Sequence, residues 1–572
     1  GKTPMSEKLT KSYVHGASDR PLIGMTIGDL FDQTAAKFPE RDALIVRHQS
    51  LRYSYQSLKD EVDRCARGLM ALGLQVGDRV GMWSPNYAEW VIMQFATAKA
   101  GVILVNINPS YRTHELEYAL NHSGCVALVT AGKFKTSDYT GMLQELAPEL
   151  NDCEPGKLQS AKFPDLKTIV RLGTDSVPGM FKWDDLIGMA DQVSAEDLAT
   201  RQASLQFDDP INIQYTSGTT GYPKGATLSH HNILNNGFYV GDIMKFSEVD
   251  RLVMPVPMYH CFGMVLGTMA CVAFGAAILF PNDGFDPVTV LSMVQEEKAT
   301  ALHGVPTMFI AELEHPDFND YDLSSLRTGL MAGSPCPVEV MKNVIELMNM
   351  HEVEIAYGMT ETSPVSFQTR ADAPLEKRVS TVGEVMPHTE VKIIDGDGRV
   401  TPIGDMGELC TRGYCVMLGY WNDEEKTRAA IDNGRWMHTG DLAVMDDEGY
   451  VNIVGRIKDM LIRGGENIYP REIEEFLYSH PKISDVQVIG VPDKRYGEEV
   501  MAWVKLKEGE TATFDEIVDF CKGKITHFKI PRYIKFVDGF PMTVTGKIRK
   551  IEMREVSTAE LGLQADASIA TA

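Results

Sequence analysis

Cysteine is scarce in this sequence, and the cysteines that occur are not spaced as in a metal or redox site. Nine of them are scattered along 572 residues, without a CxxC motif. An odd number of dispersed cysteines argues against a disulfide framework or a zinc site and is typical of reduced thiols. The chain also opens without a charged-then-apolar signal segment. We therefore expect a cytoplasmic location.

Positive charge is also in short supply. The chain has 55 Lys and Arg against 79 Asp and Glu, which gives a formal net charge of −24. Nucleic acid and anionic membrane surfaces would be repelled, so neither is an expected partner. An anionic ligand would need a local pocket rich in N–H groups and basic side chains. With 44% hydrophobic and 23% charged residues, the composition is that of a soluble globular protein, and the length calls for two or more domains.

One long uncharged run, from Cys261 to Phe280, bears on the class of protein. It has the length of a membrane span. A buried helix followed by a strand in a large core explains the run equally well. No asymmetry of Lys and Arg flanks it, and Gly263, Gly267 and Gly275 interrupt it. The buried interpretation is favoured, and no transmembrane segment is expected.

What the sequence does contain is a segment rich in glycine and hydroxyl groups after a short strand pattern. Residues 215–226 read YTSGTTGYPKGA and follow the alternating Ile211, Ile213 and Tyr215. Such a loop can turn successive backbone N–H groups and hydroxyls toward one anion with Lys224 close by, which is the chemistry of polyphosphate binding. It is not a Walker loop, because Lys224 follows Tyr-Pro and no Ser or Thr comes after it.

This segment resembles the phosphate-loop motif of the adenylate-forming superfamily, which includes acyl-CoA synthetases, luciferases and the adenylation domains of peptide synthetases. Four further motifs follow in the order of that family. They are YGMTET at 357–362, WMHTGD at 436–441 with GR at 455–456, KDMLIRGGEN at 458–467 and PMTVTGK at 541–547. The resemblance covers the chain from about residue 25 to 555.

The resemblance implies a multidomain α/β fold. Its parts are an N-terminal tail at 1–24, a large domain at 25–457 made of layered α/β subdomains and a small β subdomain, a hinge at 458–459, and a small mobile α+β domain at 460–572. Periodicity predicts a helix at 55–74, a strand at 80–83, and a helix followed by a strand within 90–105. In the last domain we expect a helix at 471–479, strands at 485–490, 500–504 and 534–537, and a helix started by a capping box of Thr513 and Glu516.

The activity that the resemblance implies is activation of a carboxylic acid. A carboxylate resists attack by a thiol because hydroxide is a poor leaving group, and joining the acid to AMP supplies a good one. ATP, Mg²⁺ and coenzyme A are the expected cofactor and co-substrates. By resemblance, Mg²⁺ is bound by Glu361 and Thr216. The phosphates are held by Thr216, Ser217, Gly218, Thr219, Thr220, Gly221 and Lys224.

The same resemblance assigns the rest of the nucleotide site. Tyr357 stacks on adenine, Thr360 binds the α-phosphate, Asp441 accepts from both ribose hydroxyls, and Arg456 adds a cationic donor. The remaining nucleotide-binding positions are Gly333, Ser334, Pro335, Ala356, Gly358, Met359 and Ile453.

Two lysines belong to the small domain and its hinge. In the family, this domain rotates about the position of Lys458 between two half-reactions. Lys547 is the expected catalytic lysine, whose ammonium bridges the attacking carboxylate and the α-phosphate and offsets the charge that gathers there. In the other orientation, Gly464 and Gly465 line the channel for the thiol, since glycine lets the pantetheine arm pass close to the backbone.

His260 is expected as a catalytic gate beside the acyl carboxylate. Peptide-synthetase domains place an Asp in this region to pair with an amino group, and residues 259–264 contain none. A plain carboxylic acid is therefore expected, and the stretches 412–421, 463–470 and 527–531 look like those of medium-chain acyl-CoA synthetases. The acyl pocket is apolar and rich in methionine. Its expected members are Phe262, Met264, His303, Gly304, Met308, Met331, Met359 and Val365.

The expected reaction is ligation of a short- to medium-chain fatty acid to coenzyme A through acyl-AMP, with release of AMP and pyrophosphate. Three alternatives stay open: an aromatic or keto acid as substrate, transfer of the acyl group to a carrier protein, and a protein that binds acyl-adenylate without chemistry. The last is disfavoured because the acidic and basic residues of the motifs are all present. The resemblance is also compatible with a homodimer.

Overall fold

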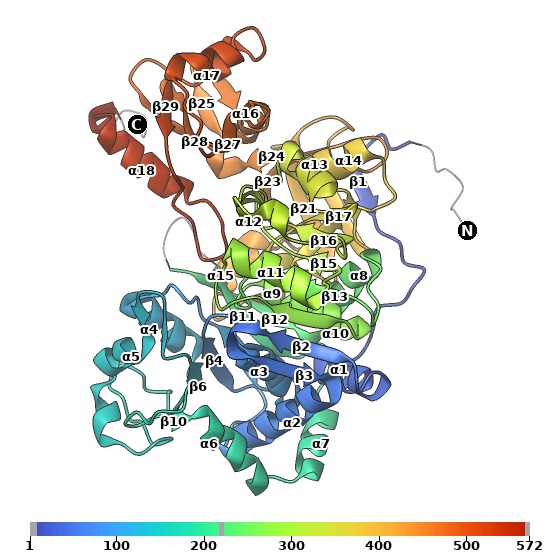
Figure 1. Cartoon of the computed structure of the whole chain (residues 1–572), viewed down its shortest axis with the longest axis vertical. Coiled ribbons are helices and arrows are strands. Elements are labelled where there is room, and N and C mark those ends of the chain that lie inside the picture. The colour runs from blue at the N-terminus through green and yellow to red at the C-terminus, as the bar shows by residue number, and fades with distance from the viewer. Residues whose placement is uncertain (1–7, 217–221, 567–572) are drawn as a thin grey trace.

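Residues 8–216 and 222–566 are described by a computed structural model, in which a small C-terminal domain sits on a much larger body (Figure 1). In these residues, sheet A has nine strands, sheet B eight and sheet C five. The order of sheet A is β19 (Glu384–Val385), β18 (Val365–Gln368), β17 (Glu352–Gly358), β16 (Thr328–Met331), β15 (Ala301–Leu302), β13 (Arg251–Val253), β14 (Ala277–Phe280), β2 (Asp42–Val46) and β3 (Leu51–Ser54).

Sheet B lies on the other side of a layer of helices. Its order is β10 (Phe181–Lys182), β9 (Thr168–Arg171), β6 (Cys125–Thr130), β4 (Arg79–Trp83), β5 (Ile103–Asn106), β11 (Pro210–Thr216), β12 (Lys224–Ser229) and β22 (Gly419–Tyr420). Both sheets are parallel in their central part. This agrees with the expected layered α/β subdomains.

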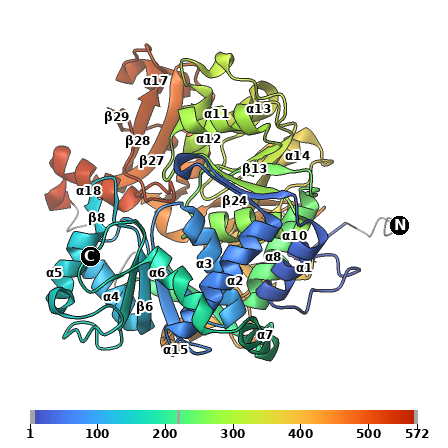
Figure 2. The ribbon, with the colours of Figure 1, turned by 60° about the horizontal axis from the view of Figure 1, so that its bottom comes forward.

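The central core fills the space between sheets A and B. It joins residues of both sheets to helices that lie side by side in Figure 2. These helices are α1 (Ile27–Lys37), α2 (Tyr55–Ala71), α3 (Ala88–Ala100), α8 (His230–Ile243) and α10 (Ala270–Phe274). An outer core on the far face of sheet A is covered by α11 (Pro287–Glu297), α12 (Pro306–Leu313) and α13 (Val338–Leu347). The expected helix at 55–74, strand at 80–83 and helix–strand pair within 90–105 are confirmed as α2, β4, α3 and β5.

Most of the uncharged run at 261–280 is buried in the central core, and Ala277 and Leu279 are buried in the outer core, as the buried interpretation predicts. It forms the short helix α9 (Cys261–Gly263), the π-helical turn η4 (Met264–Met269), α10 and then strand β14. The chain is therefore broken into pieces too short to span a bilayer. Among residues 8–216 and 222–566, no helix is both long enough and apolar enough to cross a membrane.

Sheet C forms the small β subdomain at the end of the large body. Its order is β1 (Tyr13–His15), β20 (Thr389–Ile394), β21 (Gly407–Gly413), β23 (Met437–Met445) and β24 (Val451–Arg456), all antiparallel. Strand β1 comes from the segment predicted to be an N-terminal tail, and it pairs with β20 from Tyr13 to His15. That segment therefore contributes the edge strand of the subdomain.

The C-terminal domain has a sheet of β27 (Ile483–Asp493), β28 (Gly497–Leu506) and β29 (Tyr533–Phe536) with apolar clusters on both faces. Helices α16 (Pro470–Tyr478), α17 (Phe514–Cys521) and α18 (Lys550–Glu560) cover it, and β25 (Leu461–Arg463) with β26 (Glu466–Ile468) forms a hairpin. Thr513 caps α17 by accepting from the backbone N–H of Glu516 at 3.2 Å. The capping box is incomplete, however, because the Glu516 carboxylate accepts from the Lys482 ammonium instead.

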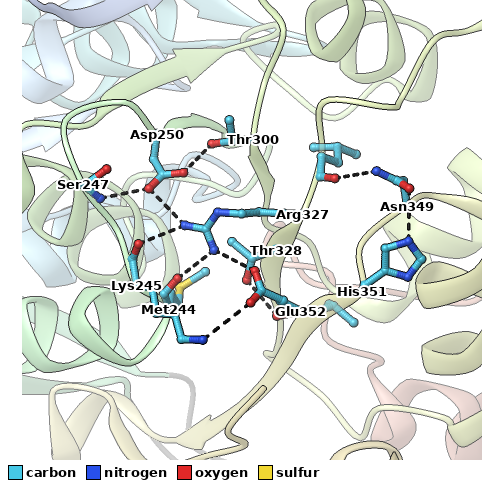
Figure 3. A network of polar contacts seen from close by, with 12 residues as sticks. Met244, Lys245, Ser247, Asp250, Thr300, Arg327, Thr328, Asn349, His351 and Glu352 are labelled. Atoms are coloured by element: carbon cyan, nitrogen blue, oxygen red, sulfur yellow. Dashed lines mark hydrogen bonds and ion pairs between the residues drawn. The ribbon is translucent and has the colours of Figure 1, made fainter. Parts of the chain in front are cut away.

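A polar network ties together the amino ends of the central strands of sheet A (Figure 3). The guanidinium of Arg327, just before β16, donates to the carboxylates of Asp250 at 3.0 Å and Glu352 at 3.2 Å. It also donates to the carbonyls of Met244 and Lys245, both at 3.0 Å. Asp250 precedes β13 and Glu352 begins β17, so one side chain fixes the starts of three strands. The opposite, carboxyl ends of these strands remain available for ligands.

We predict that Arg327→Met lowers the free energy of unfolding by about 2 kcal/mol, because the nearly buried Asp250 carboxylate loses its charged partner. Urea unfolding followed by intrinsic fluorescence measures this. The matched control is Arg428→Met, which removes an exposed ion pair with Glu424 and should change little. Since the network is at the far end of the strands, the KM for ATP should not change. An unchanged unfolding midpoint would contradict the prediction.

Candidate active site

Loops at the carboxyl ends of sheet A form one side of the candidate site, as is usual in open α/β sheets. Gly333 follows β16, and Thr360 and Glu361 follow β17 in the short helix η6 (Thr360–Thr362). His260 lies on the segment that leaves β13, where its imidazole Nδ1 accepts from the backbone N–H of Phe262 at 3.2 Å and caps α9. Three separate motifs thus meet at one edge of the sheet.

The C-terminal domain places Lys547 in this site. Figure 1 shows the segment between β29 and α18 reaching from that domain to the large body. A small cavity is lined by Lys547, Thr545, His260, Phe262, Gly333, Val256 and Pro257. Gly546 has φ of +86°, and a Cβ there would lie 2.7 Å from a Val305 side-chain carbon. Glycine is therefore required next to the lysine both for its backbone conformation and for this close approach.

Charges of both signs surround the Lys547 ammonium. Burial and the nearby cations of Arg456 and Lys458 lower its pKa, whereas the carboxylates of Glu361 and Asp441 raise it, and the result is a pKa of about 8. Such a lysine is charged at neutral pH but weakly solvated. It is therefore suited to neutralise an anion that arrives in the site.

Asp441 lies in β23 opposite Arg456 of β24. Its carboxylate accepts a short hydrogen bond from the phenol of Tyr357. Burial raises the pKa of Asp441, and the Tyr357 hydrogen bond, Arg456 and Lys547 oppose the rise. The structure thus brings together the residues that the sequence assigned to adenine, ribose and catalysis. The tyrosine ring is held by its hydroxyl, which fixes its orientation.

Glu361 is buried, and its carboxylate accepts from the hydroxyl of Tyr420 at 2.8 Å. The ammonium of Lys224 lies 4.9 Å from the centre of the same Tyr420 ring. Thr216, the last residue of β11, pairs with Lys224 at the start of β12. A carboxylate with a threonine hydroxyl supplies the hard oxygen donors that Mg²⁺ prefers, so the residue types fit that ion. The other phosphate-loop residues, Ser217 to Gly221, lie outside the described part of the chain.

Histidine 260 is partly buried, and its pKa is lowered to about 3 by burial and by the charge of Lys547. The imidazole is therefore neutral. Because Nδ1 accepts from the Phe262 N–H, the ring proton is on Nε2. A neutral ring beside the cavity can form part of its wall without repelling the lysine. This fits the predicted gate, which stays a prediction.

The expected acyl-pocket residues divide between two cores. Phe262, Met264 and Met308 are in the central core, and Phe262 also lines the cavity. The inclusion of Met331 is wrong, because its side chain packs in the outer core on the far face of sheet A. Both ring nitrogens of His303 are hydrogen-bonded to the backbone. The Leu330 N–H donates to Nδ1 at 3.1 Å, and Nε2 donates to the Leu266 carbonyl at 2.9 Å.

Two predicted regions are held by contacts with the C-terminal domain. Gly464 and Gly465 form the turn of the β25–β26 hairpin with φ of +55° and +83°, and the N–H of Gly464 donates to Tyr496 of the same domain. Their role at the thiol channel stays a prediction. The backbone carbonyl of Ile453 accepts a hydrogen bond from Arg471 of α16 at 2.7 Å, which joins β24 to the C-terminal domain. Tyr420 was missed as a site residue, because a lone tyrosine in a two-residue strand carries no signal in sequence.

Comparison with known proteins shows the family of this chain. The family model "AMP-binding enzyme" matches residues 31–421, and "AMP-binding enzyme C-terminal domain" matches residues 472–547. The chain belongs to the AMP-binding enzyme family. It is 53% identical to the putative acyl-CoA synthetase YngI of Bacillus subtilis, over 93% of this chain and 97% of that protein. It is 48% identical to the mitochondrial medium-chain acyl-CoA ligase ACSF2 of Mus musculus, over 96% of this chain and 91% of that one.

Solved structures of this AMP-binding family have the same fold. The anthranilate CoA ligase AuaEII in complex with anthranoyl-AMP aligns with a TM-score of 0.84 at 26% identity, over 95% of this chain and 99% of that chain. ATP-bound MatB from Rhodopseudomonas palustris aligns with a TM-score of 0.78 at 30% identity, over 93% and 99%. The alignments span the large body and the C-terminal domain together.

Proposed function

We propose that this family member ligates a short- to medium-chain fatty acid to coenzyme A in two half-reactions, with acyl-AMP as intermediate. The observation that carries the proposal is that Lys547, from the C-terminal domain, lines one cavity with His260 and Gly333 of the large body. There its ammonium interacts electrostatically with Asp441, Arg456 and Glu361. A nucleotide held by those residues would present its α-phosphate to the ammonium. The printed names of the relatives support the acid–CoA ligase activity.

In the first half-reaction, the acid's carboxylate oxygen attacks the α-phosphorus, a P–O bond forms, and the bond to pyrophosphate breaks. Lys547 stabilises the charge of both anions and orients them. Asp441 and Tyr357 hold the nucleoside so that the phosphorus stays in line. Mg²⁺, with Glu361 and Thr216 as its proposed ligands, would neutralise the phosphates. In the second, the thiol of coenzyme A loses its proton to solvent and its sulfur adds to the acyl carbon; a C–S bond forms, the acyl C–O bond to AMP breaks, and AMP leaves.

The acid is proposed from the cavity wall and from the relatives. Phe262 lines the cavity, and Met264 and Met308 belong to the same central core; such apolar, adaptable side chains suit aliphatic chains. The mouse relative is named a medium-chain acyl-CoA ligase. AuaEII, by its title an anthranilate CoA ligase, has the same fold, so an aromatic acid is the competing candidate.

A substrate panel tests the function. Linear acids of graded length, benzoate-type acids and keto acids are each incubated with ATP, Mg²⁺ and coenzyme A, and AMP release is followed. We expect the highest kcat/KM with a linear acid of medium length. AMP formation that requires a carrier protein in place of coenzyme A would overturn the acceptor, and a preference for aromatic acids would overturn the acid.

The pKa of Lys547 predicts a pH dependence. The ammonium is the active form, so the charge is present below about pH 8 and is lost as the pH rises through that value. We expect kcat/KM for ATP in the adenylation half-reaction to fall about tenfold per pH unit on the alkaline side. Pyrophosphate exchange across pH 6–10 measures it. Lys547→Arg should remove this alkaline limb, because the arginine stays charged, and a limb that persists in the variant would assign it to another group.

We propose a cytoplasmic location and a homodimer. A cytoplasmic, homodimeric enzyme is consistent with the sequence, although one named relative is mitochondrial. Cell fractionation and light scattering of the purified chain measure these two properties.

A further inference from the structure

The segment that carries Lys547 is a self-contained hairpin, here called the lysine hairpin, residues 541–549. At its base the N–H of Arg549 donates to the carbonyl of Pro541 at 2.8 Å. Nearer the tip, the N–H of Thr543 donates to the Lys547 carbonyl at 2.8 Å, and the N–H of Lys547 donates to the Thr543 hydroxyl at 3.1 Å. These hydrogen bonds brace the hairpin internally. The contacts at its base therefore help to set the position of the ammonium.

The base is held by a shielded ion pair. Lys550 follows the hairpin directly and begins α18, and its ammonium donates to the carboxylate of Glu474 in α16 at 2.8 Å and to the carbonyl of Val488 in β27 at 2.9 Å. The same Glu474 oxygen accepts from the Val488 N–H at 2.8 Å. The two side chains are only 16% and 8% exposed. Removing either side chain would leave the charge of the other without a partner and with little access to solvent. The geometry of the ion pair is therefore strongly restrained.

Helix α16 is also the element that docks on the large body. Its Arg471 donates to the carbonyl of Ile453 in β24 at 2.7 Å, three residues before Arg456. Its Glu475 carboxylate accepts from the N–H of Val338 at the start of α13 at 3.2 Å. Arg471 and Glu475 of this helix thus contact the large body. Glu474 of the same helix contacts Lys550 at the base of the lysine hairpin.

We propose that Lys550 and Glu474 are positioning residues for Lys547. Their ion pair fixes the lysine hairpin to α16, and α16 relates the hairpin to the large body through Arg471 and Glu475. The inference rests on the proposed function, since it assigns the pair to the half-reaction in which Lys547 acts. Formation of acyl-AMP requires the pair, and transfer of the acyl group to coenzyme A does not.

A purely structural role makes a different prediction. If the pair only stabilised the C-terminal domain, its loss would weaken both half-reactions in parallel. A role in positioning weakens the first alone, because a displacement of about 1 Å at the reacting centre can cost about 100-fold in rate. The split between the half-reactions therefore separates the two roles.

The test uses Glu474→Gln and Lys550→Met in the full chain. Acid-dependent exchange of radiolabelled pyrophosphate into ATP should fall about 10- to 100-fold. Thioester formation from coenzyme A and synthetic octanoyl-AMP should stay within about twofold of the unmodified chain, and the double variant should be no slower than the worse single variant. Glu472→Gln is the matched control. Glu472 lies on the same helix, α16, and its substitution removes a 2.7 Å ion pair with Lys529, away from the hairpin. It should change neither half-reaction.

Hydrogen exchange of residues 541–549 gives a second readout that does not depend on activity. It should be faster in both variants than in the unmodified chain and unchanged in Glu472→Gln. Unchanged exchange, or equal losses in the two half-reactions, would overturn the positioning role. If the unmodified chain activated no acid of the panel, the proposed function would fail, whereas hydrogen exchange would still decide whether the pair holds the hairpin.

Discussion

Lys547→Ala should abolish acid-dependent pyrophosphate exchange while thioester formation from supplied acyl-AMP continues. The ammonium lies among Glu361, Asp441 and Arg456 in the described arrangement, where it would meet the α-phosphate. Alanine removes the ammonium that would offset the negative charge developing at the α-phosphate. Because removal of one charge-stabilising donor typically costs 100- to 1000-fold, we expect a loss of at least about 100-fold in the first half-reaction.

The two half-reactions are measured separately, by exchange of radiolabelled pyrophosphate and by a thiol assay with synthetic acyl-AMP. Lys522→Ala is the control, since Lys522 is an exposed lysine of the same domain. Equal loss of both half-reactions in Lys547→Ala would show that the lysine does not serve adenylation alone. The assignment of Lys547 to the first half-reaction alone would then be wrong.

Substitution at Asp441 and Arg456 should move the activity's alkaline limb in opposite directions. The Asp441 carboxylate raises the pKa of Lys547, so Asp441→Asn should shift the limb to lower pH. Arg456 lowers the same pKa, so Arg456→Gln should shift it to higher pH. Asp441→Asn should also raise the KM for ATP about 10- to 100-fold, because a partly buried, charged acceptor is lost.

Pyrophosphate exchange measured as a function of pH at several ATP concentrations gives both quantities. Asp446→Asn is a useful control, because Asp446 lies in the turn after β23 and pairs with Lys377, away from the cavity. Shifts of the same sign in the Asp441 and Arg456 variants would show that the limb does not report Lys547.

The motifs predict those site residues that a short stretch of the chain is enough to identify. The sequence predicts Lys547, Asp441, Glu361 and His260 as site residues because their neighbours in sequence identify them. Sheet membership was harder. Met331 was expected in the acyl pocket, but successive residues of a strand face opposite sides, and both faces of β16 are buried. Composition alone does not tell which buried face adjoins the pocket.

Contacts between distant residues were outside the reach of sequence. Glu474 and Lys550 are 76 residues apart, and nothing in either local stretch pairs them. Glu516 was expected to complete a capping box, yet Lys482 from before β27 competes for its carboxylate. Tyr420 likewise lies beside Glu361 and Lys224 only because β22 pairs with β12. In each case the deciding partner is supplied by tertiary packing.

Strand β1 has a practical consequence for handling the protein. It covers the outer edge of β20, in the same sheet that holds Asp441 and Arg456. Proteolytic trimming past His15 would uncover a row of backbone donors and acceptors, which is a template for intermolecular pairing. Affinity tags and shortened expression versions should therefore keep residues 8–16, or aggregation would be mistaken for poor folding of the catalytic body.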